Sequence, residues 1–584
     1  MNETASIRRA KHPVIAGVCI AAVFAMSLVV CLWALELTSI PFLKQLDDTG
    51  RNIASVVLVI ASFALIYVVS WLCLSGRVGR MLRAIPDNPP RFLGLFCCCN
   101  MRSVVMTSAV ILVFWVPILI LFYPGVTTFD GVNQLYQYSN PAPTWYSTML
   151  EWVDAEFIDH HPVFDTLVYG AFVYGAGGLF GSQNAGMFCL TLFQALLGAC
   201  ALGGSICYLE RLGVPAPVRL VSVLFAALFP LFPINAATML KDTLHAPFFL
   251  LFAVLFVELC RTKGRSLQSP RVLVGLCVVA VLCALTKKTG LYIAVPSLLI
   301  AGIVYRKARI WIAAVVPALV AVVLVPCLVY PLLGGVASGG RQEMLALPFQ
   351  QTTTVALEAA GDVTADEVAT IDRVLDLEKA KTKYSNDLAD GAKNSFRRSA
   401  TASDMLAYLG VWAAQGVRHP DLYLKSMLLC SGSMLVPSEQ LTIYTGMGNK
   451  ANKYFTEKSA SIGQSFVCSL ERPAELADAV ESYNSGFTTV ATGNPITAFF
   501  FSKGLWGGWL PIFCILVALI LDRKRAFWLF PIVLAVLMLV LCPVDDARYV
   551  FPMLYCAPLL VGVAASAMMQ PAQLHDGRLR HAKN

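Results

Sequence analysis

The sequence has 584 residues, of which 57% are hydrophobic and only 14% are charged, and its mean hydropathy is +0.67. Soluble domains carry about 25% charged residues, so this composition excludes an ordinary soluble domain. Apolar runs of roughly 17–25 residues recur and are long enough to cross the ~30 Å core of a bilayer as helices. The formal net charge of +8 lies mostly in short loops, as orientation signals require, and is no evidence for a nucleic-acid partner.

We predict an all-α polytopic membrane protein that is embedded in the lipid bilayer by about twelve transmembrane helices. The first apolar run follows Arg8, Arg9 and Lys11 and is longer than the core of a signal peptide, so we interpret it as a retained anchor. The predicted spans are 13–36, 52–75, 103–122, 185–208, 216–238, 243–260, 271–286, 289–305, 309–332, 496–521, 526–543 and 549–568.

The apolar stretch 162–182 needs a separate test, because it contains Asp165 and five glycines. If this stretch does not cross the membrane, all seven basic clusters of the chain lie on the same side of it, as expected for cytoplasmic loops. If it does cross, five of the seven change sides. We therefore predict a juxtamembrane or re-entrant helix at 162–182 on the outer face, with both chain ends in the cytoplasm.

The predicted spans divide the chain into four parts. Segment 334–495 is the sizeable soluble region, and Thr364 to Glu367 has the pattern of a capping box, so we expect a mostly helical extracytoplasmic domain. Its two cysteines, Cys430 and Cys468, can pair in an oxidising exterior, which the sequence leaves open. The four parts are a two-helix extension (1–102), a transmembrane core (103–333), the outer domain (334–495) and the C-terminal helices with a basic tail (496–584).

The first outer loop, 123–161, carries the strongest functional pattern. Asp130 follows a span by a few residues and is a candidate general base, although an acid in a Phe-Asp-Gly turn is also common. The loop is rich in aromatic, amide and acidic side chains, which suit a sugar site and equally an interfacial belt. These are Asn133, Gln134, Tyr136, Gln137, Trp145, Tyr146, Glu151, Trp152, Asp154 and Glu156.

Four cations fall in short outer loops, where positive charge is unusual. Lys241, Lys287, Lys288 and Arg548 are candidate phosphate ligands, with Tyr549 beside the arginine. For each of these residues taken alone, the alternative to phosphate binding is a side chain at the end of a span that extends its charge to the membrane surface. Asp242, next to Lys241, either pairs with that lysine or completes the site as a second acid.

Two further pairs are weaker candidates for substrate binding. His160 and His161 close the first loop, and neighbouring side chains on a helix diverge, so the pair does not predict a metal site. We expect one histidine to face the site and the other to be structural. Gln350 and Gln351 lie near the start of the predicted outer domain. Two interpretations are open: they line a groove for the acceptor, or they belong to the polar start of a helix. The sequence requires no metal and leaves the use of a divalent cation open.

Together these features resemble the GT-C fold glycosyltransferases, such as protein mannosyltransferases and aminoarabinose transferases. More specifically, the order of motifs is similar to that of a poorly characterised bacterial GT-C-like family, with motif-level support over 103–305. The matching motifs are Asp130 after a span, His161-Pro162, Leu179-Phe180-Gly181, Asp242, Lys287-Lys288-Thr289-Gly290 and Arg548-Tyr549 before Pro552. The chain departs from the mannosyltransferases in having Phe129-Asp130-Gly131 where they have an Asp-Glu pair.

The resemblance implies an inverting sugar transfer at the outer face of a bacterial plasma membrane. The donor would be a polyprenyl-phosphate sugar and the acceptor an envelope glycan, lipid or protein. Asp130 would be the base, Lys287, Lys288 and Arg548 would hold the phosphate, and Asp242 and His161 would shape the pocket. A flippase of lipid-linked sugars and a non-catalytic assembly protein are the rivals. The near absence of charges in mid-span favours the transferase over the flippase.

Overall fold

The computed structural model describes residues 9–34, 46–87, 93–140, 157–437 and 439–570. Most of them lie in helices, and the described strands are only two or three residues long. Eight helical segments are long and apolar enough to cross a membrane, so the chain is an all-α multi-pass membrane protein. These are α1 (Pro13–Ala34), α2 (Asp48–Leu74), α4 (Met101–Leu121), α9 with η4 (Gln183–Leu212), α12 (Lys241–Arg261), α14 (Lys288–Tyr305), α15 to α16 (Ala308–Leu332) and η11 with α29 (Ala547–Met568).

The remaining four predicted spans correspond to shorter apolar helices, so the number twelve stays a prediction. They are α10 (Ala216–Leu228), α13 (Pro270–Thr286), η10 with α26 (Leu505–Leu521) and α28 (Phe530–Val540). The ambiguous stretch folds into α7 (Val163–Gly170), the π-helical turn η3 (Ala171–Ala176) and α8 (Gly177–Leu179), and it is also too short to count among the eight.

Helix α29 (Phe551–Met568) forms the centre of the bundle. Of the apolar window in Ala547–Met568, 94% is buried, against 11% for α2 at the periphery. Large side chains surround it: Tyr555 meets Phe232 edge-on, and Phe232 stacks on Trp115. Such contacts fix the helix by van der Waals packing, because lipid gives little hydrophobic drive between helices.

Two short parallel strands bring distant parts of the chain together at one end of the bundle, which we call the site end. Strand β1 (Val126–Thr127) pairs with β3 (Thr238–Met239), and they run into α5 (Phe129–Ser139) and α12 respectively. Gly125 before β1 has φ +143, and a Cβ there would lie 2.5 Å from Met187 Cε, so this turn requires glycine. The first turns of α5 and α12 therefore lie side by side.

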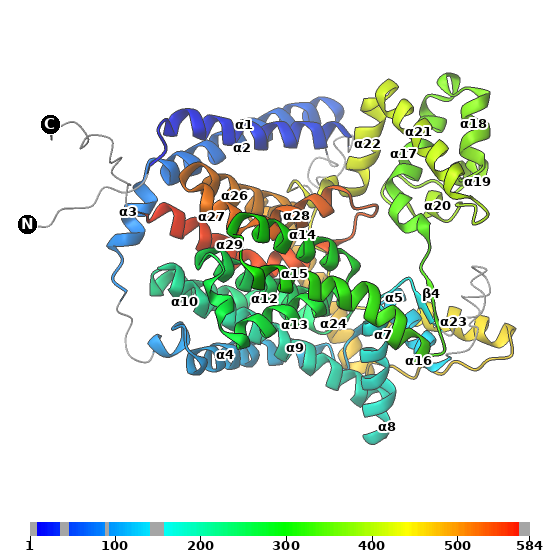
Figure 1. Cartoon of the computed structure of the whole chain (residues 1–584), viewed down its shortest axis with the longest axis horizontal. Helices are drawn as coiled ribbons and strands as arrows, with labels where there is room; N and C mark the ends of the chain where they lie inside the picture. Colours follow the sequence, from blue (N-terminus) through cyan, green and yellow to red (C-terminus); the bar gives the residue numbers. More distant parts are fainter. Residues whose placement is uncertain (1–8, 35–45, 88–92, 141–156, 438, 571–584) are drawn as a thin grey trace, which may run out of the picture.

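The outer domain is a compact helical unit beyond the site end, at the upper right of Figure 1. The predicted capping box at Thr364 is present, and its core packs Phe349 and Tyr408 with Ile371. Its helices are α17 (Ala346–Glu358), α18 (Ala365–Asp372), α19 (Leu377–Thr382), α20 (Asp390–Lys393), α21 (Ala402–Arg418) and α22 (Pro420–Ser431). Cys430 and Cys468 are free thiols, so the structure does not pair them.

The link from the bundle to this domain also passes the site end. Strand β2 (Phe157–Asp159) pairs in parallel with β4 (Val336–Ser338), just before the short helix η7 (Arg341–Leu345). Two more helices, α23 (Asn449–Ser461) and α24 (Ala474–Thr492), return the chain to the bundle, followed by α25 (Pro495–Phe500). Helix α3 (Arg77–Ala84), with its three arginines, lies at the opposite end from α5 and β4 (Figure 1).

Candidate functional site

Four helices begin at the site end within reach of one another. They are α5, α7, α12 and α14, whose first turns carry Asp130, Asp165, Asp242 and Lys288 respectively. A helix N-terminus presents unpaired N–H groups and a partial positive charge, so it attracts anions. Several such ends beside lysine side chains make this region suited to an anionic ligand.

Asp130 lies at the centre of the site. Its carboxylate forms an ion pair with Arg548, which is 418 residues away in the chain, and lies 3.8 Å from Nε2 of the buried His161. Burial raises the pKa of the Asp130 carboxyl, but nearby His161, Arg548 and Lys241 lower it by more, so the pKa is well below its usual value. Burial holds the pKa of His161 well below its usual value. Asp130 is therefore an ion-paired carboxylate at pH 7.

A second ion pair lies beside the first. Lys287 binds the fully buried carboxylate of Asp242, and its ammonium lies 4.5 Å from the centre of the Tyr549 ring. The Arg548 guanidinium lies 5.1 Å from the same ring. Both cations therefore lie close enough to the Tyr549 ring for a cation–π interaction, and Arg548 Nη2 also donates to its hydroxyl at 3.4 Å.

Lys288 and Lys241 complete the set of cations. Lys288 bonds to the carbonyl and carboxylate of Asp159, at 3.1 Å from Oδ2, and remains half exposed. Lys241 makes no hydrogen bond or ion pair with any residue that the structure describes. It nevertheless lies close enough to Asp130 to lower the pKa of that carboxyl. Lys241 is therefore the cation whose charge is not compensated by an ion pair within the described residues and can bind an anionic ligand.

The three lysines line a cavity of about 300 Å³, which we call the lysine cavity. Its polar wall is formed by His160, Lys241, Lys287, Lys288, Glu343 and Tyr549. Its other wall is apolar and comes from α12, α14, α28, α29 and the residues just after α28, including Phe249, Ile293, Met538, Leu541 and Met553. Leu541 is 53% exposed, so the apolar wall reaches the outer surface of the bundle. A cavity with this division suits a ligand with an anionic head and an apolar tail.

A buried acid lies beneath the lysines. Both oxygens of Asp165 are buried without a hydrogen-bond partner among the described residues, and so is the hydroxyl of Tyr169 one turn later. Burial raises the pKa of Asp165 well above its usual value. The charge of Lys241 lowers this pKa by less than burial raises it, and the nearby carboxylate of Asp242 raises it further. Burial therefore favours the protonated form of Asp165, which can donate a hydrogen bond, whereas the pKa of Asp130 is shifted in the opposite direction.

The turn that carries Arg548 is held by a separate polar network. Asp546 accepts bonds from Tyr444 Oη and lies 3.2 Å from Arg548 Nε. The adjacent Asp545 pairs with the buried Lys503 at 2.8 Å, and Lys503 also pairs with Glu439 at 2.8 Å. These contacts fix the turn and hence the direction of the guanidinium toward Asp130.

Glu343 connects the site to the outer domain. Its carboxylate lies 3.4 Å from His160 Nδ1 and 3.2 Å from Lys393 Nζ in α20. Burial raises the pKa of Glu343, but the hydrogen bond to His160 and the charge of Lys393 lower it to about 2. The contact joins the first loop, the lysine cavity and α20.

Glu343→Gln is expected to reduce the stability of the protein at pH 7 by about 1 kcal/mol, because a third of the carboxylate is exposed and screened. The folded-state pKa is depressed, so the stabilisation is present above 4.5, its usual value, and disappears as the pH falls toward 2. Unfolding of both proteins in detergent at pH 3 to 7 measures this. A difference that grows toward acid pH would contradict the assigned pair.

The structure brings most of the predicted site residues together. His160, Lys241, Lys287, Lys288 and Tyr549 line the lysine cavity. Asp242, His161 and Arg548 each contact one of these lining residues. Asp130 lies one contact further away, next to Arg548 and His161. Gln350 and Gln351 do not belong to this group. They are buried in the outer domain, where their amides donate to the carbonyls of Ser385 and Tyr423. The predicted groove role is therefore replaced by a structural one.

Other predicted loop residues lie outside the described residues, namely Trp145, Tyr146, Glu151, Trp152, Asp154 and Glu156. The sequence reasoning missed Asp159, Asp165 and Glu343 as members of the site. Asp159 was recognisable beside the histidines, whereas nothing in the sequence distinguishes Glu343 from other surface acids. Among the described residues, no group of three or more His, Cys, Asp or Glu side chains is arranged to hold a metal ion.

Comparison with curated proteins and with solved structures gave no match. A family profile, in contrast, matches residues 18–573, which is nearly the whole chain. The protein thus belongs to a family of unknown function, DUF6020.

Proposed function

We propose that the protein is a membrane glycosyltransferase, which transfers a sugar from a polyprenyl-phosphate donor to a cell-envelope acceptor at the outer face of the membrane. One observation carries this proposal: the lysine cavity combines an unpaired lysine and several helix N-termini with an apolar wall that reaches the bundle surface. A lipid phosphate has the matching shape, with a charged head and a long apolar chain.

The charge balance favours a donor with a single phosphate. Lys287, Lys288 and Arg548 are each paired with an aspartate, which leaves Lys241 as the uncompensated cation of the described cavity. A phosphodiester between a sugar and a polyprenol carries one negative charge and matches one free ammonium. A diphosphate would require further cations to be released from their carboxylates.

In the proposed reaction, an acceptor hydroxyl attacks C1 of the sugar and its proton passes to Asp130. The bond between C1 and the phosphate oxygen breaks, and its electron pair stays on the oxygen of polyprenyl phosphate. C1 inverts because attack and departure occur on opposite sides. Lys241 and Lys287 stabilise the charge that develops on the leaving oxygen.

Arg548 couples donor binding to the strength of the base. While it is paired with Asp130, the carboxylate is a weak base, because its pKa lies well below the usual value. The guanidinium lies beside the cavity wall, because Arg548 Nη2 donates to the hydroxyl of the lining residue Tyr549 at 3.4 Å. A phosphate bound in the cavity attracts this guanidinium, which weakens its ion pair with Asp130 and raises the pKa of Asp130. The base thus gains strength when the donor is in place.

The test measures consumption of synthetic polyprenyl-phosphate sugars, and label transfer to envelope fractions, by the purified protein in nanodiscs. Lys241→Met is expected to raise KM for the donor about 10- to 100-fold, because it removes a charged partner of the phosphate. Lys524→Met, in α27 (Arg523–Trp528), is the matched control and should leave KM unchanged.

Two outcomes would count against the transferase. If the wild type consumes none of several such donors, the result favours a flippase or a non-catalytic assembly protein over the transferase. If Lys241→Met and Lys524→Met have the same KM as the wild type, the lysine cavity does not hold the phosphate.

A further inference from the structure

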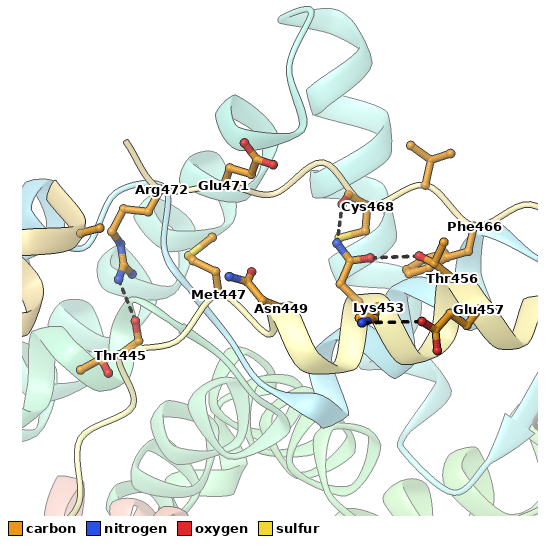
Figure 2. A pocket seen from close by; sticks show the side chains of 13 residues that line it. Thr445, Met447, Asn449, Lys453, Thr456, Glu457, Phe466, Cys468, Glu471 and Arg472 are labelled. Atoms are coloured by element: carbon orange, nitrogen blue, oxygen red, sulfur yellow. Dashed lines mark hydrogen bonds and ion pairs between the residues drawn. The ribbon is translucent and has the colours of Figure 1, made fainter. Parts of the chain in front are cut away.

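A second, larger cavity lies beside the site end, formed by segment 445–449, helix α23 and segment 466–472. Its volume is about 860 Å³. Figure 2 shows Arg472, Glu471 and Cys468 on one side of it, with Thr445, Met447 and Asn449 facing them. We call it the outer cavity.

The walls of the outer cavity are fixed by side chains that bond to backbone. The Arg472 guanidinium donates to the carbonyls of Thr445 (2.7 Å) and Gly125 (3.0 Å). Asn452 donates to the carbonyl of Cys468 at 2.7 Å, and the Asn184 amide bonds to both backbone groups of Glu471. The cavity is therefore held in shape before any ligand binds, which reduces the entropy cost of binding.

The chemistry of its lining differs from that of the lysine cavity. Two cations, Lys453 and Arg472, face two carboxylates, Glu457 and Glu471, so the formal charge of the lining is zero. Arg472 is committed to backbone carbonyls, and Lys453 lies 3.9 Å from Glu457. Asn452 and Thr456 bond to each other, and Asn452 also bonds to the Cys468 carbonyl. The groups that remain for a ligand are an amide, a hydroxyl and a carboxylate, on Asn449, Thr445 and Glu471. These groups suit a neutral ligand with many hydroxyls and not an anion.

One segment of chain separates this cavity from Asp130. Thr445 and Met447 line the outer cavity, while Tyr444 in the same segment bonds to Asp546, the partner of Arg548. The amide of Thr127, three residues before Asp130, donates to the carbonyl of Gly446 at 3.1 Å. Neighbouring hydrogen-bonded chains lie about 5 Å apart, so a ligand in the outer cavity is close to the general base.

We infer that the outer cavity binds the acceptor, and that the acceptor is a neutral carbohydrate chain. The inference rests on the proposed transferase function and names its second substrate. The chain lies between α23 and segment 466–472, and its terminal hydroxyl passes the edge of segment 445–447 to reach Asp130. That hydroxyl attacks C1 of the donor sugar and gives its proton to the carboxylate, while the electron pair of the broken C1–O bond leaves on polyprenyl phosphate.

The experiment uses the full chain in nanodiscs, with oligosaccharides released from the host envelope and separated into neutral and anionic fractions. Label transfer from the polyprenyl-phosphate sugar into each fraction is measured. Saturation-transfer NMR with the same fractions measures binding directly, with no donor present. We expect the neutral fraction to bind and to be labelled, and the anionic fraction to do neither.

Asn449→Ala and Glu471→Gln are expected to raise KM for the neutral fraction about tenfold each, which is the effect of losing one ligand hydrogen bond. Both side chains are exposed, so neither variant should affect folding. Donor hydrolysis without acceptor should remain at the wild-type rate. The matched control is Asn484→Ala, in a neighbouring cavity of about 420 Å³ lined by residues 439–443 and 484–492.

The outcomes separate this inference from the proposed function. If the wild type hydrolyses the donor but the two variants keep the wild-type KM for acceptor, the outer cavity is not the acceptor site. Labelling of protein or of the anionic fraction alone would also overturn the inference and leave the transferase intact. Failure of the wild type to consume any donor in the presence of envelope fractions would overturn the transferase itself.

Discussion

Asp130→Asn is expected to reduce the rate of sugar transfer about 10²- to 10⁴-fold, the range that a general base contributes. The amide has almost the same shape as the carboxylate but cannot accept the proton of the attacking hydroxyl. It also loses the ion pair with Arg548, so the guanidinium becomes free to hold the phosphate and the donor KM should not rise. The measurement is kcat at saturating donor and acceptor, with protein folding checked by size-exclusion chromatography.

Asp376→Asn is the matched control, because Asp376 caps helix α19 in the outer domain and should leave kcat unchanged. The pH profile gives a second check. In the free enzyme Asp130 has a depressed pKa, so it is already ionised and kcat/KM should not fall between pH 7 and about pH 4. An acid limb near pH 6, or full activity in Asp130→Asn, would contradict its role as the base.

Lys287→Met is expected to lower the free energy of unfolding by about 3–5 kcal/mol. The variant leaves the carboxylate of Asp242, whose side chain is fully buried, without its ion-pair partner. The other oxygen of that carboxylate has no hydrogen-bond partner among the described residues, so Lys287 bears most of the compensation. Equilibrium unfolding in mixed micelles measures the loss.

The neighbouring lysine supplies the control for this prediction. Lys288 is 48% exposed in its side chain, so Lys288→Met should cost less than about 1 kcal/mol. The double variant Lys287→Met/Asp242→Asn should recover much of the loss, because it removes the uncompensated charge. Equal stability of Lys287→Met and Lys288→Met would contradict the buried pair.

Much of the membrane architecture could be predicted from composition and apolar runs. The predicted spans at 13–36, 103–122 and 243–260 coincide with long helices, since about twenty apolar residues have few other stable conformations in a bilayer. The helix α13 (Pro270–Thr286) agrees with the predicted span 271–286, whereas α10 and α28 are shorter than the predicted spans 216–238 and 526–543. At these positions apolar sequence continues past the helix end, as at Phe229, and hydropathy alone does not mark where the helix stops.

The membership of the site was predictable, but its contacts were not. Asp130 stood out as an acid just after a predicted span, and Arg548 as a cation in a loop predicted to be short and on the outer face. Their ion pair nevertheless spans 418 residues and depends on the packing of α29. Glu343 meets His160 only because β2 and β4 pair in parallel. Gln350 was assigned to a groove because an amide looks the same in sequence whether it lines a cavity or bonds to a buried carbonyl.

The central position of α29 has a consequence for how the protein is made. The helix with the most buried surface follows the other described helices in the chain, so it leaves the ribosome after the helices that enclose it. The earlier helices must enter the bilayer with a gap at their centre, which α29 then fills. Arg548 is synthesised together with this helix, long after its ion-pair partner Asp130. Asp130 therefore has no Arg548 to pair with until the last part of the chain has been made. Nascent chains stalled before residue 547 should therefore be targets for membrane quality-control proteases.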